Sequence, residues 1–396
     1  MGVALHRTWR LFLSSWIRLT KWEYWPPWLS YLPLVGWIGV QAIRHRSLVV
    51  FTGANPAIPA GGFIGESKIA ILEGLWKSRD RVARSELIAG SSSEIAKRDR
   101  IHTWLQRQGL SLPIVLKPNE GQRGSGVVIA KSSDELHAYL RQSTVDTIAQ
   151  EYVPGVEFGV FYCRKPSEAH GRIISVTEKR LPFVVGDGHR PLERLILGDR
   201  RSLGMARFHL RRQQARLNEI PAPGEVVSLG ELGTHCRGAL FLDGRAALTP
   251  EVERAFDDMS RAFDGFYFGR YDVRARSVED FRAGRFTVIE LNGVTSEATH
   301  IYDPRIGLLD AYRALLEQWL LAFEIGAENV RRGAETTSIR ELVRLLLRYR
   351  ETAQRHLDES PATARDRSPS TPSSRAPEPS RGSTLRRDEG ILASRS

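Results

Sequence analysis

The chain has 396 residues, of which 41% are hydrophobic, so it is long enough to form two or three domains around a substantial core. Its formal net charge of +11 favours an anionic partner, without choosing among a nucleotide phosphate, an acidic lipid and a nucleic acid. The two cysteines, Cys163 and Cys236, exclude a disulfide framework and a cysteine-built zinc site, and they fit a reducing, cytoplasmic setting.

Residues 1–46 form a segment of their own, because they combine many tryptophan and tyrosine rings with Lys and Arg and a single acid, Glu23. Such a mixture is typical of a segment that lies at the surface of an anionic membrane. The apolar run 28–43 is interrupted by proline and glycine and is shorter than the roughly 20 residues that span a bilayer, so spanning is disfavoured. Two interpretations stay open: an arm that packs onto the body, or a peripheral anchor at the inner face of the membrane.

Residues 47–112 are expected to form a shortened α/β region that precedes the nucleotide site. Ile69, Leu72 and Trp76 recur at helical spacing, which predicts a helix there. The other elements predicted in this region are a strand at 47–52, a Gly/Pro loop at 53–65, a strand at 84–88 and a helix at 93–108.

Residues 113–180 are expected to be mainly strands. A helix-start signal, Ser132-Ser133-Asp134-Glu135, predicts one helix that runs to residue 142. The strands predicted in this region are 113–117, 127–130, 147–152, 157–163 and 171–178.

Residues 181–350 mix both kinds of element, and residues 351–396 are expected to be a disordered tail, because Ser, Pro, Thr and Arg replace apolar residues there. The predicted elements are helices at 190–216, 251–263 and 308–349, strands at 225–229, 266–275 and 286–291, and a hairpin turn at the polar insertion 276–285. Strands and helices intermix along the chain, which predicts the α+β class with largely antiparallel sheets.

A glycine-rich turn joins the strand that ends at Lys117 to the strand that begins at Val127. Its candidate binding residues are Gly121, Arg123, Gly124, Ser125 and Gly126. Glycines let backbone amides approach an anion closely, and Lys117 and Arg123 add positive charge, so the turn predicts a hairpin flap over phosphate. It is neither a P-loop nor a Rossmann turn, because it lacks the Gly-Lys-Ser/Thr ending and is followed by a strand. A purely structural turn is the alternative.

Two later strands carry polar residues at alternate positions, Arg270 and Asp272 on one and Glu290 and Asn292 on the other. Residues two apart on a strand share a face, so these side chains converge if the strands are neighbours. Mg²⁺ prefers hard oxygen ligands shared with substrate phosphates, and Arg270 is suited to stabilise charge on a transferred phosphoryl group. The pattern predicts a magnesium site on Asp272, Glu290 and Asn292, with a solvated sheet face as the alternative.

Together these motifs resemble the ATP-grasp superfamily, in particular carboxylate-amine ligases such as D-alanine:D-alanine ligase and the glutathione-synthetase-like half of cyanophycin synthetase. The resemblance covers residues 65–305. It implies an ATP-grasp fold in which two α+β subdomains clasp ATP. Residues 113–180 would be the small subdomain with the glycine-rich loop, and residues 181–350 the C-terminal subdomain with the metal site.

The resemblance also implies roles for single residues, each matched to a family motif. It likens Lys68 and Lys117 to the two phosphate-binding lysines, Glu151-Tyr152-Val153 to the adenine hinge, Glu157 to the ribose acid, Lys179 to a further basic residue of the site, Arg270 to the phosphate arginine, and Asp272, Glu290 and Asn292 to the metal ligands. Loop residues expected near the substrate are His235, Cys236, Thr295, Ser296, Thr299 and His300.

The activity implied by the resemblance is ligation of a small-molecule carboxylate and an amine through an acyl phosphate. ATP and one or two Mg²⁺ ions, or Mn²⁺, are the implied cofactors. The oligomeric state stays open, with a homodimer as one option because dimers are common among the relatives. Two alternatives stay open: a non-catalytic, membrane-associated ATP-binding sensor, and an ATP-dependent phosphotransferase. Nucleic-acid binding is disfavoured, because Phe208 is the only aromatic ring in the basic stretch 200–216.

Overall fold

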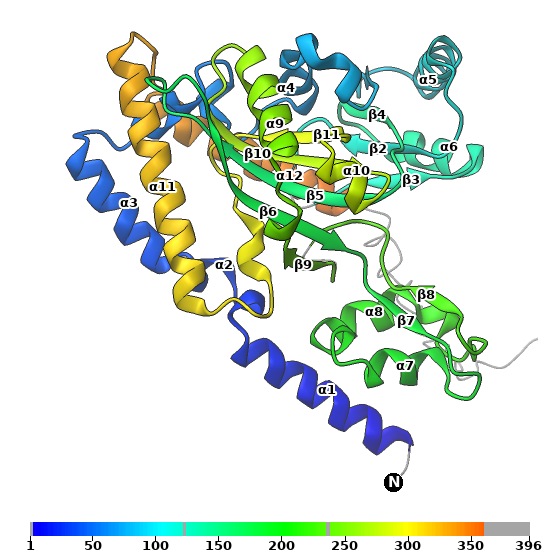
Figure 1. The fold of residues 1–396 in the computed structure, drawn as a ribbon. Helices are drawn as coiled ribbons and strands as arrows, with labels where there is room; N and C mark the ends of the chain where they lie inside the picture. The colour runs from blue at the N-terminus through cyan, green and yellow to red at the C-terminus, as the bar shows by residue number, and fades with distance from the viewer. Residues whose placement is uncertain (1–2, 122–123, 235–237, 360–396) are drawn as a thin grey trace, which may run out of the picture.

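The fold of the computed structural model is drawn in Figure 1, and residues 3–121, 124–234 and 238–359 are described below. The α-helices in these ranges are α1 (Val3–Thr20), α2 (Pro27–Ser30), α3 (Leu32–Arg44), α4 (Lys68–Gly74), α5 (Glu94–Gln108), α6 (Ser133–Gln142), α7 (Leu192–Gly198), α8 (Ala206–Arg212), α9 (Pro250–Ala262), α10 (Val278–Arg282), α11 (Leu308–Arg331) and α12 (Ile339–Glu359). Short 3-10 helices are η1 (Trp22–Tyr24), η2 (Val50–Ala54), η3 (Pro59–Gly61), η4 (Trp76–Arg81), η5 (Ser202–Met205), η6 (Gln214–Arg216), η8 (Arg245–Ala247) and η9 (Thr299–Tyr302).

The strands pair into antiparallel sheets, which confirms the predicted α+β class. They are β1 (Ser85–Ile88), β2 (Ile114–Pro118), β3 (Val128–Ala130), β4 (Thr147–Glu151), β5 (Val156–Cys163), β6 (Arg172–Arg180), β7 (Phe183–Val185), β8 (Val226–Ser228), β9 (Leu240–Asp243), β10 (Phe268–Ala275) and β11 (Thr287–Asn292).

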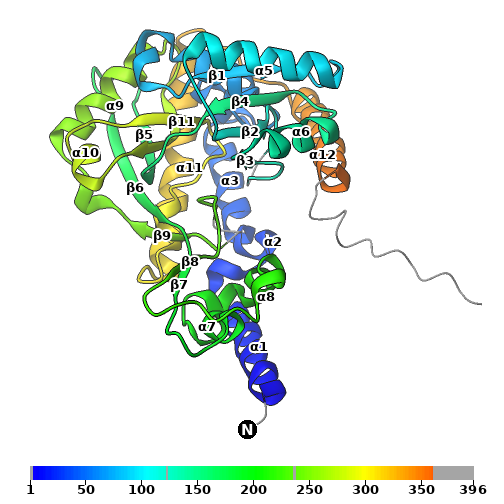
Figure 2. The same cartoon turned by 90° about the vertical axis from the view of Figure 1, so that its right-hand side faces the viewer.

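A four-stranded sheet in the order β1-β4-β2-β3 is covered by α5 and α6, as Figure 2 shows from the side. Ser93 and Ser132 cap the two helices, their hydroxyls accepting the backbone N–H groups of Ala96 and Glu135. Trp104 from α5 is almost completely buried with β2 residues in the core between helices and sheet. Burial of this apolar face holds the β2–β3 hairpin, and therefore the glycine-rich turn, in place.

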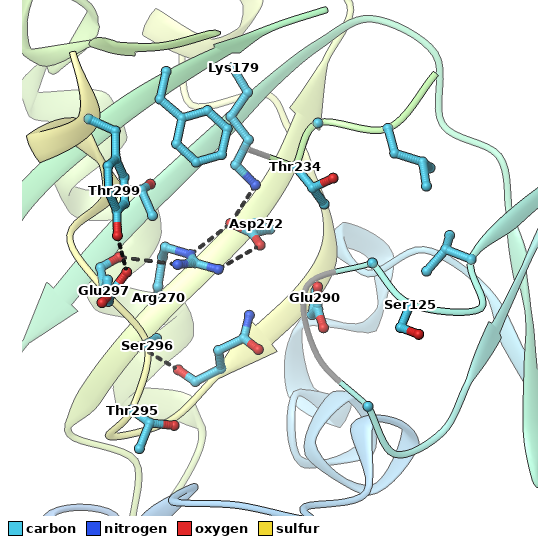
Figure 3. Close-up of a pocket in the computed structure, with 18 of the residues that line it drawn as sticks. Ser125, Lys179, Thr234, Arg270, Asp272, Glu290, Thr295, Ser296, Glu297 and Thr299 are labelled. Atoms are coloured by element: carbon cyan, nitrogen blue, oxygen red, sulfur yellow. Dashed lines mark hydrogen bonds and ion pairs between the residues drawn. The ribbon is translucent and has the colours of Figure 1, made fainter. Parts of the chain in front are cut away.

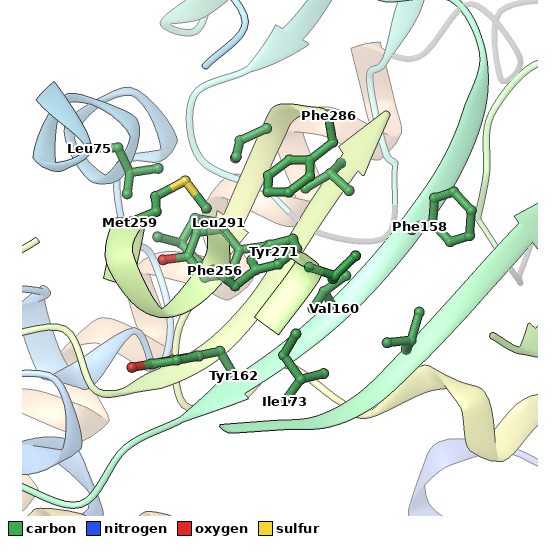
Figure 4. Close-up of a cluster of buried hydrophobic side chains, with 14 of the residues drawn as sticks. Leu75, Phe158, Val160, Tyr162, Ile173, Phe256, Met259, Tyr271, Phe286 and Leu291 are labelled. Carbon is green, nitrogen blue, oxygen red and sulfur yellow. The ribbon is translucent and has the colours of Figure 1, made fainter. Parts of the chain in front are cut away.

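A five-stranded sheet in the order β11-β10-β5-β6-β9 forms the larger body. One face packs against α9 and α10, and Figure 4 shows Phe256, Tyr271, Phe286 and Leu291 gathered there. The Phe256 and Phe286 rings stack with centroids 4.4 Å apart. Because side chains alternate along a strand, the polar residues of β10 lie on the opposite face of the sheet.

Residues 3–46 pack along the body. Contacts link α1 to α7 and α8, and α3 to α11, and Figures 1 and 2 show both pairs side by side. The Trp37 indole donates to the Leu316 carbonyl at 3.0 Å, and Leu34 is 4% exposed in a cluster with Leu315 of α11. No helix within the described ranges is long and apolar enough to cross a membrane.

Two short predicted elements differ from the structure. Residues 47–52 are not a strand: η2 lies there, because this apolar segment packs as a buried turn on α11 and the Thr52 hydroxyl donates back to the Val49 carbonyl. The insertion 276–285 is more than a turn, because Ser277 caps α10 and Phe281 of that helix is fully buried.

The two long predicted helices are each divided into shorter helices in the structure. The stretch 190–216 is divided into α7, η5, α8 and η6. The predicted helix 308–349 divides into α11 and α12, separated by a segment in which Gly333 has a φ of 98°. Helix α12 continues to Glu359, beyond the predicted start of the tail, and residues 360–396 lie outside the described ranges.

The sheets also divide the chain differently from the predicted domain boundaries. The boundary at 112/113 separates β1 from its partner β4, and the boundary at 180/181 separates β5 and β6 from β10 and β9. Strand pairing between distant segments decides these units, and it is not visible in the order of elements along a chain.

Candidate active site

One continuous cavity of about 850 Å³ lies between the two larger sheets and the N-terminal segment. Its polar part is lined by the glycine-rich turn, the β4–β5 connection and the polar face of the five-stranded sheet. Figure 3 shows Ser125 of the turn together with Lys179, Asp272 and Glu290 of the sheet. The other part of the cavity is lined by α3 and α11. The volume of the whole cavity is near the upper end of the roughly 300 to 1,000 Å³ that is typical of ligand sites.

Strand register brings the polar residues of the sheet together. Asp272 of β10 lies opposite Glu290 of β11 on one side and Gly159 of β5 on the other. A Cβ at Gly159 would lie 3.3 Å from Asp272 Oδ1, so this glycine leaves room for the carboxylate. The predicted neighbour relation of the two polar strands is therefore present.

Asp272 is held by two cations from different strands (Figure 3). Lys179 Nζ lies 3.0 Å from Asp272 Oδ1, and the Arg270 guanidinium donates to both carboxylate oxygens at 3.0 and 3.1 Å. Burial disfavours ionisation of Asp272, but Arg270 and Lys179 outweigh it and lower its pKa to about 2. Asp272 is thus a carboxylate at every physiological pH.

Glu157 also accepts from two cations, Lys179 Nζ at 2.9 Å and Arg274 Nη2 at 3.0 Å. Burial opposes the charge of Lys179, yet Asp272 and Glu157 raise its pKa above the usual value. Arg274 was not predicted, although it follows Arg270 and Asp272 on the same face of β10, and this spacing was the available signal. The role of Glu157 as a ribose acid stays a prediction.

Lys68 and Lys117 enter the cavity from α4 and β2. Lys117 Nζ donates to Gln150 Oε1 and to the Ile289 carbonyl, both at 3.0 Å, and burial lowers its pKa to about 8. Lys68 Nζ donates to the Gly121 carbonyl and lies 4.0 Å from Glu290 Oε1. These two lysines thus link the glycine-rich turn and the four-stranded sheet to β11.

The glycine-rich turn connects β2 to β3, as predicted. Gly124 and Gly126 have φ values of 71° and 69°, which glycine adopts without strain. Gly121, Gly124 and Ser125 line the cavity, while Arg123 lies outside the described ranges. Phosphate binding by this turn stays a prediction.

The predicted adenine hinge follows β4. Tyr152 and Val153 line the cavity, and the Arg274 guanidinium lies 5.6 Å from the centre of the Tyr152 ring. The Glu151 carboxylate accepts from Arg84 at 2.8 and 2.9 Å, and this hydrogen bonding lowers its pKa. The hinge is therefore tied to the segment that precedes β1.

The predicted metal ligands offer two carboxylates and an amide. Asp272 and Glu290 lie opposite each other on the adjacent strands β10 and β11. Asn292 Nδ2 is buried and has no hydrogen-bond partner among the described residues. Nowhere in those ranges do three or more His, Cys, Asp or Glu form a group able to hold a metal ion. Hard oxygen donors on adjacent strands fit Mg²⁺. Glu290 is more available to a metal than Asp272, because its nearest cation, Lys68, lies 4.0 Å away.

Charged side chains of both signs line the polar part of the cavity. The cations are Lys68, Lys117, Lys179, Arg270 and Arg274, and the acidic residues are Glu66, Glu151, Glu157, Asp272, Glu290 and Glu297. Burial raises the pKa of Glu66, which favours its neutral form, and Glu66 was not predicted. The five cations are the groups of this cavity that a polyanion would contact.

The loop after β11 closes this part of the cavity. Thr295, Ser296 and Thr299 line it, as expected, whereas His300 is buried and pairs with Ser175 at 2.8 Å. His235 and Cys236 lie outside the described ranges.

Glu297 in the same loop was missed by the sequence prediction. Its carbonyl accepts from Arg270 at 3.1 Å, its carboxylate accepts from the Tyr302 hydroxyl at 3.0 Å, and burial raises its pKa to about 7. A lone glutamate in a loop has no periodicity that would reveal it.

Comparison with known proteins gives a family match and several related folds. Residues 74–161 match the RimK-like ATP-grasp domain. Similar solved structures include a bifunctional glutathione synthetase from Pasteurella multocida, with 16% identity and a TM-score of 0.36 over 63% of this chain and 36% of that one. The D-alanine–D-alanine ligase from Bacillus anthracis matches with 14% identity and a TM-score of 0.38 over 67% of this chain and 69% of that one.

The VanG D-Ala:D-Ser ligase from Enterococcus faecalis matches with 13% identity and a TM-score of 0.38, over 65% of this chain and 61% of that one. The match to the glutathione synthetase spans little more than a third of that protein. No curated protein matches the chain. The family match includes β1, which agrees with its pairing to β4. Within residues 74–161 the chain therefore matches an ATP-grasp domain, which confirms the resemblance that its motifs predicted.

Proposed function

We propose that the chain binds MgATP in the polar part of this cavity and uses it to join a carboxylate to an amine. The observation that carries the proposal is the meeting of five cations with the Asp272–Glu290 pair in one cavity, beside a segment that matches the RimK-like ATP-grasp domain. A triphosphate is a polyanion that such cations neutralise, and the two carboxylates supply oxygen ligands for Mg²⁺.

The proposed reaction has two steps. A carboxylate oxygen of the first substrate attacks the γ-phosphorus of ATP, and ADP leaves with the electron pair of the broken P–O bond. The amine nitrogen of the second substrate then attacks the acyl carbon, inorganic phosphate leaves, and the nitrogen loses a proton as the amide forms.

The residues of the chain bind and orient the reactants. Lys68 and Lys117 bind phosphate oxygens, and Arg270, fixed by Asp272, neutralises charge on the transferred phosphoryl group. The glycine-rich turn covers the phosphates and excludes water that would hydrolyse the acyl phosphate. Bound Mg²⁺ would add charge neutralisation, held by Asp272 and Glu290.

ADP release by the purified full chain tests the proposal, with panels of carboxylates and amines supplied singly and together. A ligase releases ADP and phosphate only when both substrates are present. ADP release with a single acceptor would identify a phosphotransferase, and MgATP binding without turnover on every pair would identify a sensor. Either of the last two results contradicts ligation.

The exposed face of α1 favours a second property, which is binding to an anionic membrane surface. Leu13 and Ile17 pack toward α7 and α8. The outer face carries a row of large apolar side chains that are 55–68% exposed, namely Leu5, Trp9, Phe12, Trp16 and Leu19. Such a contiguous patch is unusual on a protein that is surrounded by water, and the basic residues of this segment suit anionic lipid.

Vesicle cosedimentation tests this second property. We expect the chain to pellet with vesicles that contain phosphatidylserine and less with pure phosphatidylcholine. The double variant Trp9→Ser/Trp16→Ser should lose this binding. Trp76→Ser is the matched control, because Trp76 is 61% exposed but lies on η4. Equal binding by the double variant and the control would contradict the proposal.

A further inference from the structure

The second part of the cavity is a helical chamber with apolar walls. From the N-terminal segment it is lined by Tyr31, Leu34, Val35 and Ile38, which recur at the spacing of one helix face. From α11 it is lined by Leu308, Ala311, Tyr312 and Leu315, at the same spacing. The two faces are packed together at Leu34, Ala311 and Leu315. The residues beside them that keep exposed surface border the open space, namely Tyr31, Val35, Leu308 and Tyr312.

The walls of the helical chamber are firmly attached to each other. The Tyr312 hydroxyl donates to the Ser30 carbonyl at 3.0 Å, which joins α11 to the end of α2. The Trp22 ring stacks on Tyr302 with centroids 5.4 Å apart. The N-terminal segment is thus a built wall of the cavity rather than a loosely placed arm.

The helical chamber meets the polar part of the cavity at Glu297. The Tyr302 hydroxyl donates to its carboxylate, and its backbone carbonyl holds Arg270, which contacts Asp272. A molecule that lies in the chamber would therefore present one end to Glu297 and Arg270. These are the groups beside which the proposed phosphoryl transfer takes place.

We propose that the helical chamber binds the apolar tail of one of the two ligase substrates, with its carboxylate or amine head at Glu297 and Arg270. This inference rests on the proposed function and deepens it, because it names the substrate class: an acid or amine with an alkyl or aromatic tail. An apolar cavity joined to a few convergent polar groups is the usual form of a small-molecule site.

The chamber reaches the surface beside Val35, which lines the cavity and is 63% exposed. A tail can therefore enter without unfolding the wall. Burial of a methylene group is worth up to about fourfold in affinity, so longer tails are expected to bind more tightly until the chamber is filled. A chamber that served packing alone would show no such dependence.

Isothermal titration of the full chain with two ligand series tests the inference in the presence of MgATP. One series is butyrate, hexanoate and octanoate, and the other is butylamine, hexylamine and octylamine. We expect affinity to rise with length in one series, which also tells whether the acid or the amine carries the tail. Flat or undetectable binding in both series would overturn the inference.

Substitutions that fill the helical chamber from either wall test whether the tail binds there. Val35→Trp fills the chamber from α3 and Leu308→Trp fills it from α11, and each should weaken octyl binding by about tenfold or more. The matched controls are Val40→Trp and Leu309→Trp, which change exposed residues of the same helices outside the cavity wall. If the control substitutions weakened octyl binding as much as the chamber-filling substitutions, the inference would be overturned.

A separate titration with MgATP alone distinguishes the two proposals. If MgATP fails to bind, the proposed function fails whatever the tails do. If MgATP binds with the same affinity to the parent chain and the chamber-filling variants while no tail binds, the proposed function stands and the helical chamber is not a substrate site.

Discussion

Lys179 Nζ lies 3.0 Å from Asp272 Oδ1, and these side chains are only 5% and 6% exposed. The contact crosses β5, which separates β6 from β10 in the sheet. The contact is diagonal, because Lys179 lies opposite Glu157 on β5 while Asp272 lies opposite Gly159, which has no side chain to occupy the space beside the carboxylate. A buried ion pair of this kind is costly to break on one side, since the remaining charge loses its partner.

Lys179→Met should destabilise the folded protein by about 3 kcal/mol, because Asp272 and Glu157 each lose one of two cationic partners in a buried site. Urea unfolding measures the change. Arg180→Met is the control on the same strand, since Arg180 pairs with Glu178 at the surface and should change stability by about 0.5 kcal/mol or less. Equal effects of the two variants would show that the buried pair is not structurally important.

The affinity for MgATP should fall as the pH rises through about 8, because burial lowers the pKa of Lys117 to that value and the neutral amine no longer attracts phosphate. Above the pKa the expected loss is up to about tenfold per pH unit. Titration calorimetry across this range measures it. In Lys117→Arg the guanidinium keeps its charge, so the decline should disappear. An unchanged decline in this variant would assign the titration to another group.

The same lysine should have the opposite effect on stability. Its pKa is about 8 in the folded chain and near the usual 10.5 in the unfolded chain, so the unfolded state binds more protons between these values. Stability therefore rises with pH across this window through Lys117. Urea unfolding of the parent chain and Lys117→Met should differ in slope there.

Local patterns predicted the strands of the site well. Alternation along each strand placed Arg270 with Asp272 and Glu290 with Asn292, and the structure supplies the pairing of β10 with β11 that brings the two pairs together. Arg274 follows the same alternation and was overlooked. Lys179 came from a family motif, and its contact with Asp272 depends on register across three strands, which no local pattern specifies.

The walls of the helical chamber were less predictable. Tyr31, Leu34 and Ile38 have helical spacing, but the apolar run that contains them is also typical of a membrane-associated segment. The choice between these depends on whether α11 offers a complementary face, which is a tertiary property. The same ambiguity explains η2, because a short apolar run fits a strand and a buried turn equally well.

Asp272→Asn and Glu290→Gln should each lower ATP turnover by about a hundredfold or more, because each removes a charge that the proposed metal and phosphate binding requires. Both variants keep the shape of the side chain and should stay folded, but Asp272→Asn should lose stability because it removes a buried anionic partner from Lys179 and Arg270. ADP release measures turnover, and circular dichroism checks the fold. Glu251→Gln, at an exposed surface pair, is the control. Turnover that equals the control would refute the metal assignment.

Gly126→Ala should weaken MgATP binding. Gly126 has a φ of 69°, and an added Cβ would lie 2.7 Å from Pro118 Cγ, so the glycine-rich turn must shift. Gly109→Ala is the control. Gly109 has a φ of 61°, so alanine there causes the same backbone strain, but the space around its Cβ position is open and no neighbouring atom has to move. Both variants should lose about 1 to 2 kcal/mol of stability, and only Gly126→Ala should change the dissociation constant. Unchanged MgATP affinity in Gly126→Ala would mean that this turn does not contact the nucleotide.

Leu34→Ala should destabilise the whole protein, because Leu34 is 4% exposed and packs with Ala311 and Leu315 of α11. The expected loss is about 2 to 4 kcal/mol, as for other buried leucines. Leu32→Ala is the matched control, since Leu32 belongs to the same helix, is 64% exposed and should cost about 0.5 kcal/mol or less. Urea unfolding of both variants measures the difference. If Leu34→Ala behaved like its control, the N-terminal segment would unfold independently of α11 and could not form a wall of the substrate site.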